Sequence, residues 1–228
     1  IKRTDANGHS ITYTYDDRGN MLSMTDAKGN TDYYTYDDVF NNVTSFQDRN
    51  GNTYRLDYND KGDLTSLTGP EGLSYSFIYN SRGWAVIATD ALNNVTTTSY
   101  NDDGTTAQIM DAAGYTTTYG YDGYGRLTQV TDSKQQMTTM AYNNNGWLTS
   151  VTDAMGHRTS VSRDKVGHVV RQTNAKKQIT AYTYDPLGSI LTRTDALKGV
   201  TRMEYDGRGN VISVTDPLGR KQTLTYDE

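Results

Sequence analysis

The chain of 228 residues contains no cysteine and only three prolines. Without cysteine it can form neither disulfides nor thiolate metal sites. It has no run of about 18 apolar residues, so we expect no membrane-spanning helix. Its 22 basic and 27 acidic residues are interspersed and give a net charge of −5. Because no basic run is present to follow phosphates, we expect no nucleic-acid partner.

Apolar residues are also scarce, at 34% of the chain, and the mean hydropathy is −0.77. These values are low for a solid globular core. Intrinsic disorder is nevertheless a poor alternative, because 19 tyrosines and many threonines and valines favour strands. The 21 glycines indicate many tight turns. The composition therefore predicts a sheet with one solvated face.

A repeat of about 21 residues organises the whole chain. Its anchor is a tyrosine followed by Asp or Asn: Tyr15, Tyr36, Tyr58, Tyr79, Tyr100, Tyr121, Tyr142, Tyr184, Tyr205 and Tyr226. The double interval after Tyr142 contains a degenerate copy with Arg163-Asp164. A glycine follows four residues after the anchor position, at Gly19, Gly62, Gly83, Gly104, Gly125, Gly146, Gly167, Gly188 and Gly209. The copy "YDDVFNN" lacks this glycine and has one extra residue, which predicts an irregular loop.

Asp-x-x-Gly marks two turns in each repeat, as at Asp206–Gly209 and Asp216–Gly219. Type I turns favour Asp first, Pro second and Gly fourth. All three prolines stand at that second position. The segments between turns alternate apolar and polar residues, which predicts short strands. Leu148 and Val151 are three residues apart, so either a bulge separates them or Leu148 belongs to the turn exit.

Connections of about four residues join only antiparallel neighbours, so each repeat is expected to be a β-hairpin. The predicted fold class is all-β: tandem hairpins of about 21 residues in one long antiparallel meander. An open sheet of about 21 strands is expected to curl, and a barrel of that many strands is too wide for side chains to fill its interior. We therefore expect the sheet to curl into part of a hollow shell. We interpret residues 1–228 as a single array of about ten repeats, a fragment of a longer shell whose end strands pair with flanking repeats.

No singular constellation of chemistry-bearing residues stands out against this regular background. The Asp-rich turns lack the twelfth-position Glu of a calcium loop, and His9, His157 and His168 occupy unrelated repeat positions. We therefore predict no catalytic residues, no metal site and no cofactor. The tyrosine rows fit packing between strands, with sugar stacking as the alternative. Trp84 and Trp147, just after two turn glycines, are the candidate sugar-stacking residues.

The segments "YDGYGRLTQVTD" (121–132) and "YDGRGNVISVTDPLG" (205–219) resemble the Rhs or YD repeat, and the resemblance covers essentially the whole chain. Rhs proteins, the shell components of insecticidal toxin complexes, wall-associated toxins and teneurins share this repeat. The resemblance implies a β-ribbon wound into a hollow shell, which in the toxin members encloses a variable C-terminal toxin domain. Those members also carry a self-cleaving cap. Here "DPLG" at 185–188 and 216–219 is only repeat turn, so no cleavage residue is assigned.

The first hypothesis is a non-enzymatic shell segment of a bacterial Rhs-type polymorphic toxin, of the kind used in bacterial competition. It would encapsulate a C-terminal toxin domain for secretion and delivery into target cells. The expected partners are flanking repeats, the enclosed toxin domain and secretion machinery such as type VI. The expected location is secreted or at the bacterial cell surface, and cytoplasmic before delivery. The alternative is an extracellular carbohydrate-binding or adhesion surface, with a glycan as partner.

Overall fold

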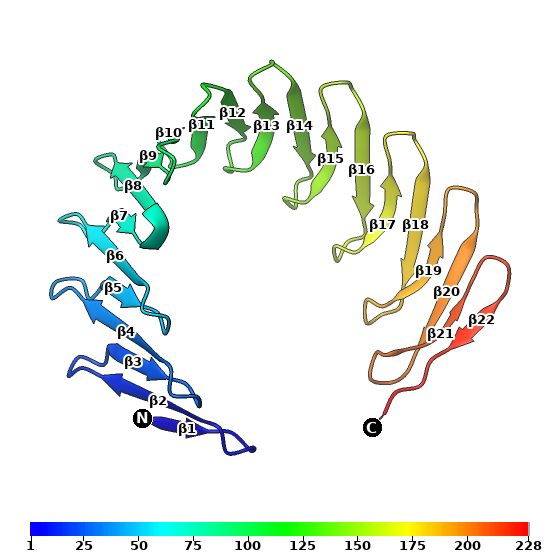
Figure 1. Ribbon diagram of the computed structural model, residues 1–228. Helices are drawn as coiled ribbons and strands as arrows, with labels where there is room; N and C mark the ends of the chain where they lie inside the picture. The colour runs from blue at the N-terminus through cyan, green and yellow to red at the C-terminus, as the bar shows by residue number, and fades with distance from the viewer. Residues whose placement is uncertain (228) are drawn as a thin grey trace. The chain divides into compact units, whose positions relative to one another are not determined.

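The computed structural model describes residues 1–227, which are almost entirely short β-strands and tight turns (Figure 1). The chain divides into two compact units, Ile1–Thr117 and Thr118–Glu228, with the boundary inside β12. The strands to that boundary are β1 (Lys2–Thr4), β2 (Ser10–Tyr15), β3 (Met21–Thr25), β4 (Thr31–Tyr36), β5 (Val43–Gln47), β6 (Thr53–Tyr58), β7 (Leu64–Thr68), β8 (Ser74–Tyr79), β9 (Ala85–Thr89), β10 (Val95–Tyr100), β11 (Thr106–Met110) and β12 (Thr116–Tyr121). The others are β13 (Leu127–Thr131), β14 (Met137–Tyr142), β15 (Leu148–Thr152), β16 (Arg158–Arg163), β17 (Val169–Thr173), β18 (Ile179–Tyr184), β19 (Ile190–Thr194), β20 (Val200–Tyr205), β21 (Val211–Thr215) and β22 (Lys221–Thr223).

Within each unit, successive strands pair antiparallel, from β1 to β11 in the first unit and from β12 to β22 in the second. The predicted all-β meander of hairpins is therefore confirmed. The helical content is one 3₁₀ turn, η1 (Pro70–Gly72), in the part of the chain that the structure describes. No helix there is long and apolar enough to cross a membrane.

A β-bulge recurs in each hairpin that ends at an anchor tyrosine. In β14 and β15, Met140 is opposite Val151 and Tyr142 is opposite Leu148, which leaves Thr149 as the extra residue. The same one-residue shift occurs next to Tyr15, Tyr36, Tyr58, Tyr79, Tyr100, Tyr121, Arg163, Tyr184 and Tyr205. The bulge brings Leu148 and Val151 to the same face despite their spacing of three. Of the two interpretations of that spacing, the bulge is correct.

The sheet has two chemically different faces. The anchor face carries the anchor tyrosines and the apolar residues two positions before them, such as Met140, with their cross-strand partners. The opposite face, here called the hydroxyl face, is rich in threonine and serine. Its hydroxyls bond across strands, as in Thr14 to Ser23 at 2.6 Å. The pair Thr183 to Thr192, at 2.7 Å, is another example.

No apolar side chain among residues 1–227 is fully buried; the buried residues are Ser23, Asp32, Ser150 and Ser213. A single sheet layer has no second layer to cover it, so side chains are shielded only by their strand neighbours. Each hairpin therefore depends on the hairpins beside it, as expected for a repeat protein in which stability is shared between neighbouring units.

Each Asp-x-x-Gly turn is a three-residue loop closed by its aspartate. Asp206 donates its N–H to the Asn210 carbonyl at 2.9 Å, and Gly209 donates to the Asp206 carbonyl at 3.1 Å. The Asp206 Oδ1 accepts from the N–H groups of Arg208 and Asn210 at 2.9 and 2.8 Å. Gly209 has φ of 87°, the left-handed conformation that completes this hairpin turn. The recurring Asp and Gly of these turns thus form their hydrogen bonds within the turn itself.

Among residues 1–227, six other than glycine occupy the same left-handed conformation: Asn41, Glu71, Asn93, Gln135, Lys177 and Lys198. Asn41 belongs to the irregular "YDDVFNN" loop, where Asp37 donates its N–H to Asn42 across one extra residue. Asparagine tolerates this conformation, whereas a long side chain such as lysine pays a steric cost. The turns at Gln135, Lys177 and Lys198 are therefore locally strained.

Replacing Lys177 with glycine should stabilise the protein by about 1 kcal/mol, because glycine adopts positive φ without a Cβ clash. The measurement is the midpoint of urea unfolding. The matched control is K176G in the same turn, where Lys176 is not among the residues with positive φ. There glycine should be neutral or cost about 0.5–1 kcal/mol in chain entropy. Equal effects of the two substitutions would contradict the assignment of strain to position 177.

Candidate functional site

Most anchor tyrosines join their hairpin to the one before it. In eight repeats the phenol donates to the backbone carbonyl 15 residues earlier, over 2.7–2.9 Å. The pairs are Tyr36 to Met21, Tyr58 to Val43, Tyr79 to Leu64, Tyr100 to Ala85, Tyr142 to Leu127, Tyr184 to Val169, Tyr205 to Ile190 and Tyr226 to Val211. Of the other two anchors, Tyr15 is 42% exposed and Tyr121 ends β12 at the unit boundary.

The strand register explains why this bond forms. β3 and β4 pair only from Ser23 opposite Tyr33 to Thr25 opposite Thr31, so Met21 lies beyond the paired segment. The phenol of Tyr36 spans that opening and supplies a donor to the Met21 carbonyl. Burial raises the pKa of Tyr36, as it does for Tyr58, above the ordinary value of 10.0. The phenols of Tyr36 and Tyr58 thus remain protonated donors at physiological pH.

The residue just after the turn glycine makes a second contact between repeats. Trp84 lies with its ring centroid 5.3 Å from that of Tyr100 and covers Gly104, where an added Cβ would be 3.0 Å from the indole. Trp147 covers Gly167 in the same way, at 3.2 Å. Both tryptophans are half-buried by this packing. Their sugar-stacking role stays a prediction.

Each histidine directly follows a turn glycine and faces the aspartate that opens its turn, so the interpretation that the three occupy unrelated repeat positions is wrong. The Nδ1 to Oδ2 distances are 3.2 Å for His9 and Asp5, 3.0 Å for His157 and Asp153, and 3.0 Å for His168 and Asp164. His168 also stacks on the Tyr184 ring at 4.7 Å, in the position that Trp84 occupies in its repeat. Across residues 1–227, no three His, Cys, Asp or Glu side chains are grouped so that they could hold a metal ion.

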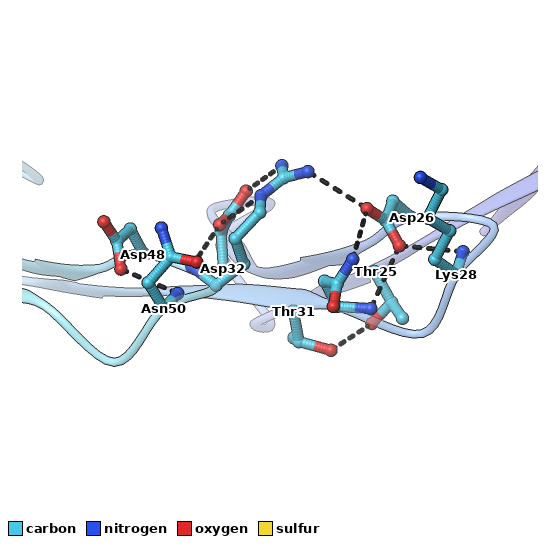
Figure 2. A network of polar contacts seen from close by, with 9 residues as sticks. Thr25, Asp26, Lys28, Thr31, Asp32, Asp48 and Asn50 are labelled. Carbon is cyan, nitrogen blue, oxygen red and sulfur yellow. Dashed lines mark hydrogen bonds and ion pairs between the residues drawn. The ribbon is translucent and has the colours of Figure 1, made fainter.

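One polar cluster breaks the repeat pattern: Arg49 pairs with Asp26 and Asp32, both labelled in Figure 2. Its guanidinium contacts the carboxylate of Asp32 at 2.8 Å and that of Asp26 at 3.0 Å, and its backbone N–H donates to Asp32 at 2.8 Å. Asp32 is only 4% exposed. The hydrogen bond and charge of Asp32 raise the pKa of Arg49. The cluster compensates a buried charge and links the turn of β3 and β4 to the turn of β5 and β6.

This cluster was not predicted from the sequence, although the sequence carries a signal for it. Asp32 stands four residues before the anchor, where the other repeats carry Ile, Tyr, Thr or Gln. Arg49 follows the first residue of the second turn, where the others carry Ala, Pro or Ser. A charged residue in each of two otherwise uncharged rows, of opposite sign and in neighbouring hairpins, predicts an ion pair. The cluster holds two hairpins together and presents no nucleophile or free base.

Comparisons with known proteins agree with the repeat pattern. The family model described as RHS Repeat matches residues 1–31, 58–99 and 100–137. The family model described as Teneurin YD-shell matches residues 127–228. A search of the curated proteins found no match.

Solved structures of toxin complexes share the fold. The crystal structure of TcdB2-TccC3-TEV superimposes with a TM-score of 0.73 at 20% identity, over 94% of this chain and 14% of that chain. TcdB2-TccC3 matches with a TM-score of 0.69 at 19% identity, over 94% and 15% of the two chains. The Tc holotoxin pore of Photorhabdus luminescens matches with a TM-score of 0.66 at 20% identity, over 94% and 14%. The chain thus spans about a seventh of the length of these structures.

Replacing Tyr184 with phenylalanine should destabilise the protein by about 1 kcal/mol, because the Val169 carbonyl loses its donor while the ring stays packed. Urea unfolding measures the change. The matched control is Y182F on the same strand: the Tyr182 phenol bonds only the exposed Gln172 side chain, and its loss should cost much less. If the two variants were equally stable, the hydroxyl contact between hairpins would be unimportant.

Acid should unfold the protein steeply below about pH 4. The side-chain amide and then the backbone N–H of Asn94 lower the pKa of Asp90, and those of Asn210 do the same for Asp206, from 3.8. A carboxylate with a lowered folded pKa contributes stability above its unfolded pKa, and that stability is lost as the pH falls through the folded value. The measurement is the urea midpoint between pH 7 and pH 2.5.

The control for the acid effect is D206N, which keeps an oxygen acceptor for the turn amides but cannot titrate. Asparagine already opens the equivalent turns at Asn80 and Asn143. The variant should show a shallower loss of stability with acid than the parent chain. An unchanged pH dependence would mean that these turn carboxylates do not control acid unfolding.

Proposed function

Because the chain belongs to the Rhs/YD-repeat family, we propose that it is a wall segment of a shell that encloses a toxin domain. The observation that carries this proposal is the fold match, in which 94% of the chain follows a segment of TcdB2-TccC3. That segment is about a seventh of the matched chain, so the proposed shell requires further repeats on the same polypeptide. Secretion and delivery of the enclosed domain are part of the proposal.

The hydrogen bonds within each unit are repeated and structural, which favours a role as a wall over a role in catalysis. The anchor phenols bond the preceding hairpin, the Asp-x-x-Gly turns bond within themselves, and the hydroxyl face bonds across paired strands. The recurring groups have the same surroundings from repeat to repeat, whereas an active site needs a nucleophile and a base held in one unrepeated arrangement. The cluster at Arg49 is unrepeated, but its charges compensate one another. We propose that the chain acts by enclosure and not by catalysis.

Bonding between hairpins also explains how a layer without a buried apolar core could serve as a wall. In eight repeats, an anchor phenol ties the chain to the preceding hairpin in addition to the strand pairing, as at Tyr36. Local opening of one hairpin then exposes only its immediate neighbours, as in other repeat arrays. A barrier built in this way keeps its integrity as long as the hydrogen bonds between hairpins persist.

Limited proteolysis of the native full-length parent tests enclosure, with intact masses compared under native and denaturing conditions. Enclosure predicts a C-terminal segment that resists protease until the protein is denatured. The double variant Y184F/Y205F removes two anchor hydroxyls and should shorten the time for which the C-terminal segment resists protease. A C-terminal segment that is digested freely from the native parent would overturn the proposal.

A further inference from the structure

A hollow of about 440 Å³ lies between two successive anchor turns of the second unit. It is lined by Tyr124 and Arg126 from one turn, and by Tyr142, Asn143, Asn144, Asn145 and Gly146 from the end of β14 and the next turn. Its volume falls within the range of small-molecule sites in proteins. All of its lining residues belong to the same unit, and they are placed by the 21-residue spacing of the two turns.

Tyr124 supplies an exposed aromatic ring at the rim of this hollow. The residue is 86% exposed, and it places an aromatic ring at a tip position where the other anchor turns carry Arg, Lys, Asp, Asn, Val or Leu. The Arg126 guanidinium lies 5.0 Å from its ring and 4.9 Å from the Tyr142 ring. Arg126 therefore holds two aromatic rings in place by cation–π contact. The Tyr124 ring is positioned by this contact while most of its surface stays available.

The charges at the hollow compensate one another. The Asp122 carboxylate contacts the Nε and Nη2 of Arg126, each at 2.7 Å, and Nη1 donates to the Asn143 carbonyl at 3.3 Å. The tip residues of the two turns are Gly123, Tyr124, Asn144 and Asn145, all uncharged, whereas most other anchor turns carry a charged side chain at the tip. The hollow thus offers no unpaired charge for an ionic ligand.

Asn144 and Asn145 provide side-chain amides that have no hydrogen-bond partner among residues 1–227, and both residues are exposed. Asn143 uses its Oδ1 to accept from the N–H groups of Asn145 and Trp147 at 3.0 Å. Each free amide offers both donors and an acceptor, the pattern that matches sugar hydroxyls.

We propose that this hollow binds a neutral pyranoside, one or two sugar units long. The apolar C–H face of the sugar would stack on the Tyr124 ring, whose negative face attracts polarised C–H groups. The hydroxyls would bond the Asn144 and Asn145 amides, and the Arg126–Asp122 pair would keep the floor rigid and uncharged. This site differs from the half-buried Trp84 and Trp147, because its ring and amides face solvent. It adds a recognition function to the wall and does not depend on enclosure.

The test is saturation-transfer-difference NMR on the full chain, with cellobiose, maltose and diacetylchitobiose as probes and glucuronate as the charged comparison. At least one neutral disaccharide should bind with a Kd on the order of 1 mM, which corresponds to weak binding. Y124A should weaken that binding at least tenfold. Because Tyr124 is exposed, the variant should unfold at the same urea midpoint as the parent chain.

The matched control is L187A, which truncates the exposed side chain at the same tip position of another anchor turn. It should leave sugar binding within twofold of the parent. N145D places a charge beside the proposed ligand and should weaken binding while the fold is retained. Absence of saturation transfer from every neutral probe, equal binding by Y124A, or stronger binding of glucuronate than of the neutral sugars would each overturn the proposal.

Discussion

The hydrogen bond from an anchor phenol to the carbonyl 15 residues earlier is the contact on which the arrangement of hairpins depends. Strand pairing alone joins successive hairpins over three residue pairs, as between β3 and β4. Beyond those pairs the strands separate, and the phenol of Tyr36 closes the opening. A tyrosine is suited to this position because its ring fills the space between hairpins while its hydroxyl reaches the backbone. The same geometry recurs in both units, with distances that differ by only 0.2 Å.

Residues 1–227 lack a buried apolar core because they form a single layer of sheet. A single layer of sheet cannot bury large side chains on both faces, so the chain uses many small polar contacts in place of a few large apolar ones. Threonine and serine hydroxyls pair on one face, while aromatic and aliphatic rows pack on the other. Each contact is worth little by itself, but it recurs with every repeat. Stability is thus distributed along the chain, and a local substitution acts mainly on its own hairpin and the neighbours.

Departures from the repeat pattern coincide with individual side-chain contacts and with the proposed binding site. Arg49 forms ion pairs with Asp26 and Asp32, and Arg49 and Asp32 stand at positions where the other repeats carry uncharged residues. Tyr124 and the asparagines at 143–145 create an uncharged hollow between two turns that elsewhere carry charge. In both cases the backbone keeps the regular turn geometry and only the side chains change. The repeat therefore works as a constant frame on which individual sites can be placed.

The periodic sequence by itself determined the strands, the turns and their antiparallel order, because these depend on local chemistry. An aspartate that accepts turn amides and a glycine at positive φ specify each corner, as at Asp206 and Gly209, wherever they occur. The bulge at Thr149 needed the structure, since a spacing of three fits two local geometries. The reach of Tyr184 to Val169, the burial of Asp32 by Arg49 and the hollow beside Tyr124 were decided only by tertiary structure. These contacts join residues 15 to 22 positions apart, and their geometry depends on how far neighbouring hairpins separate.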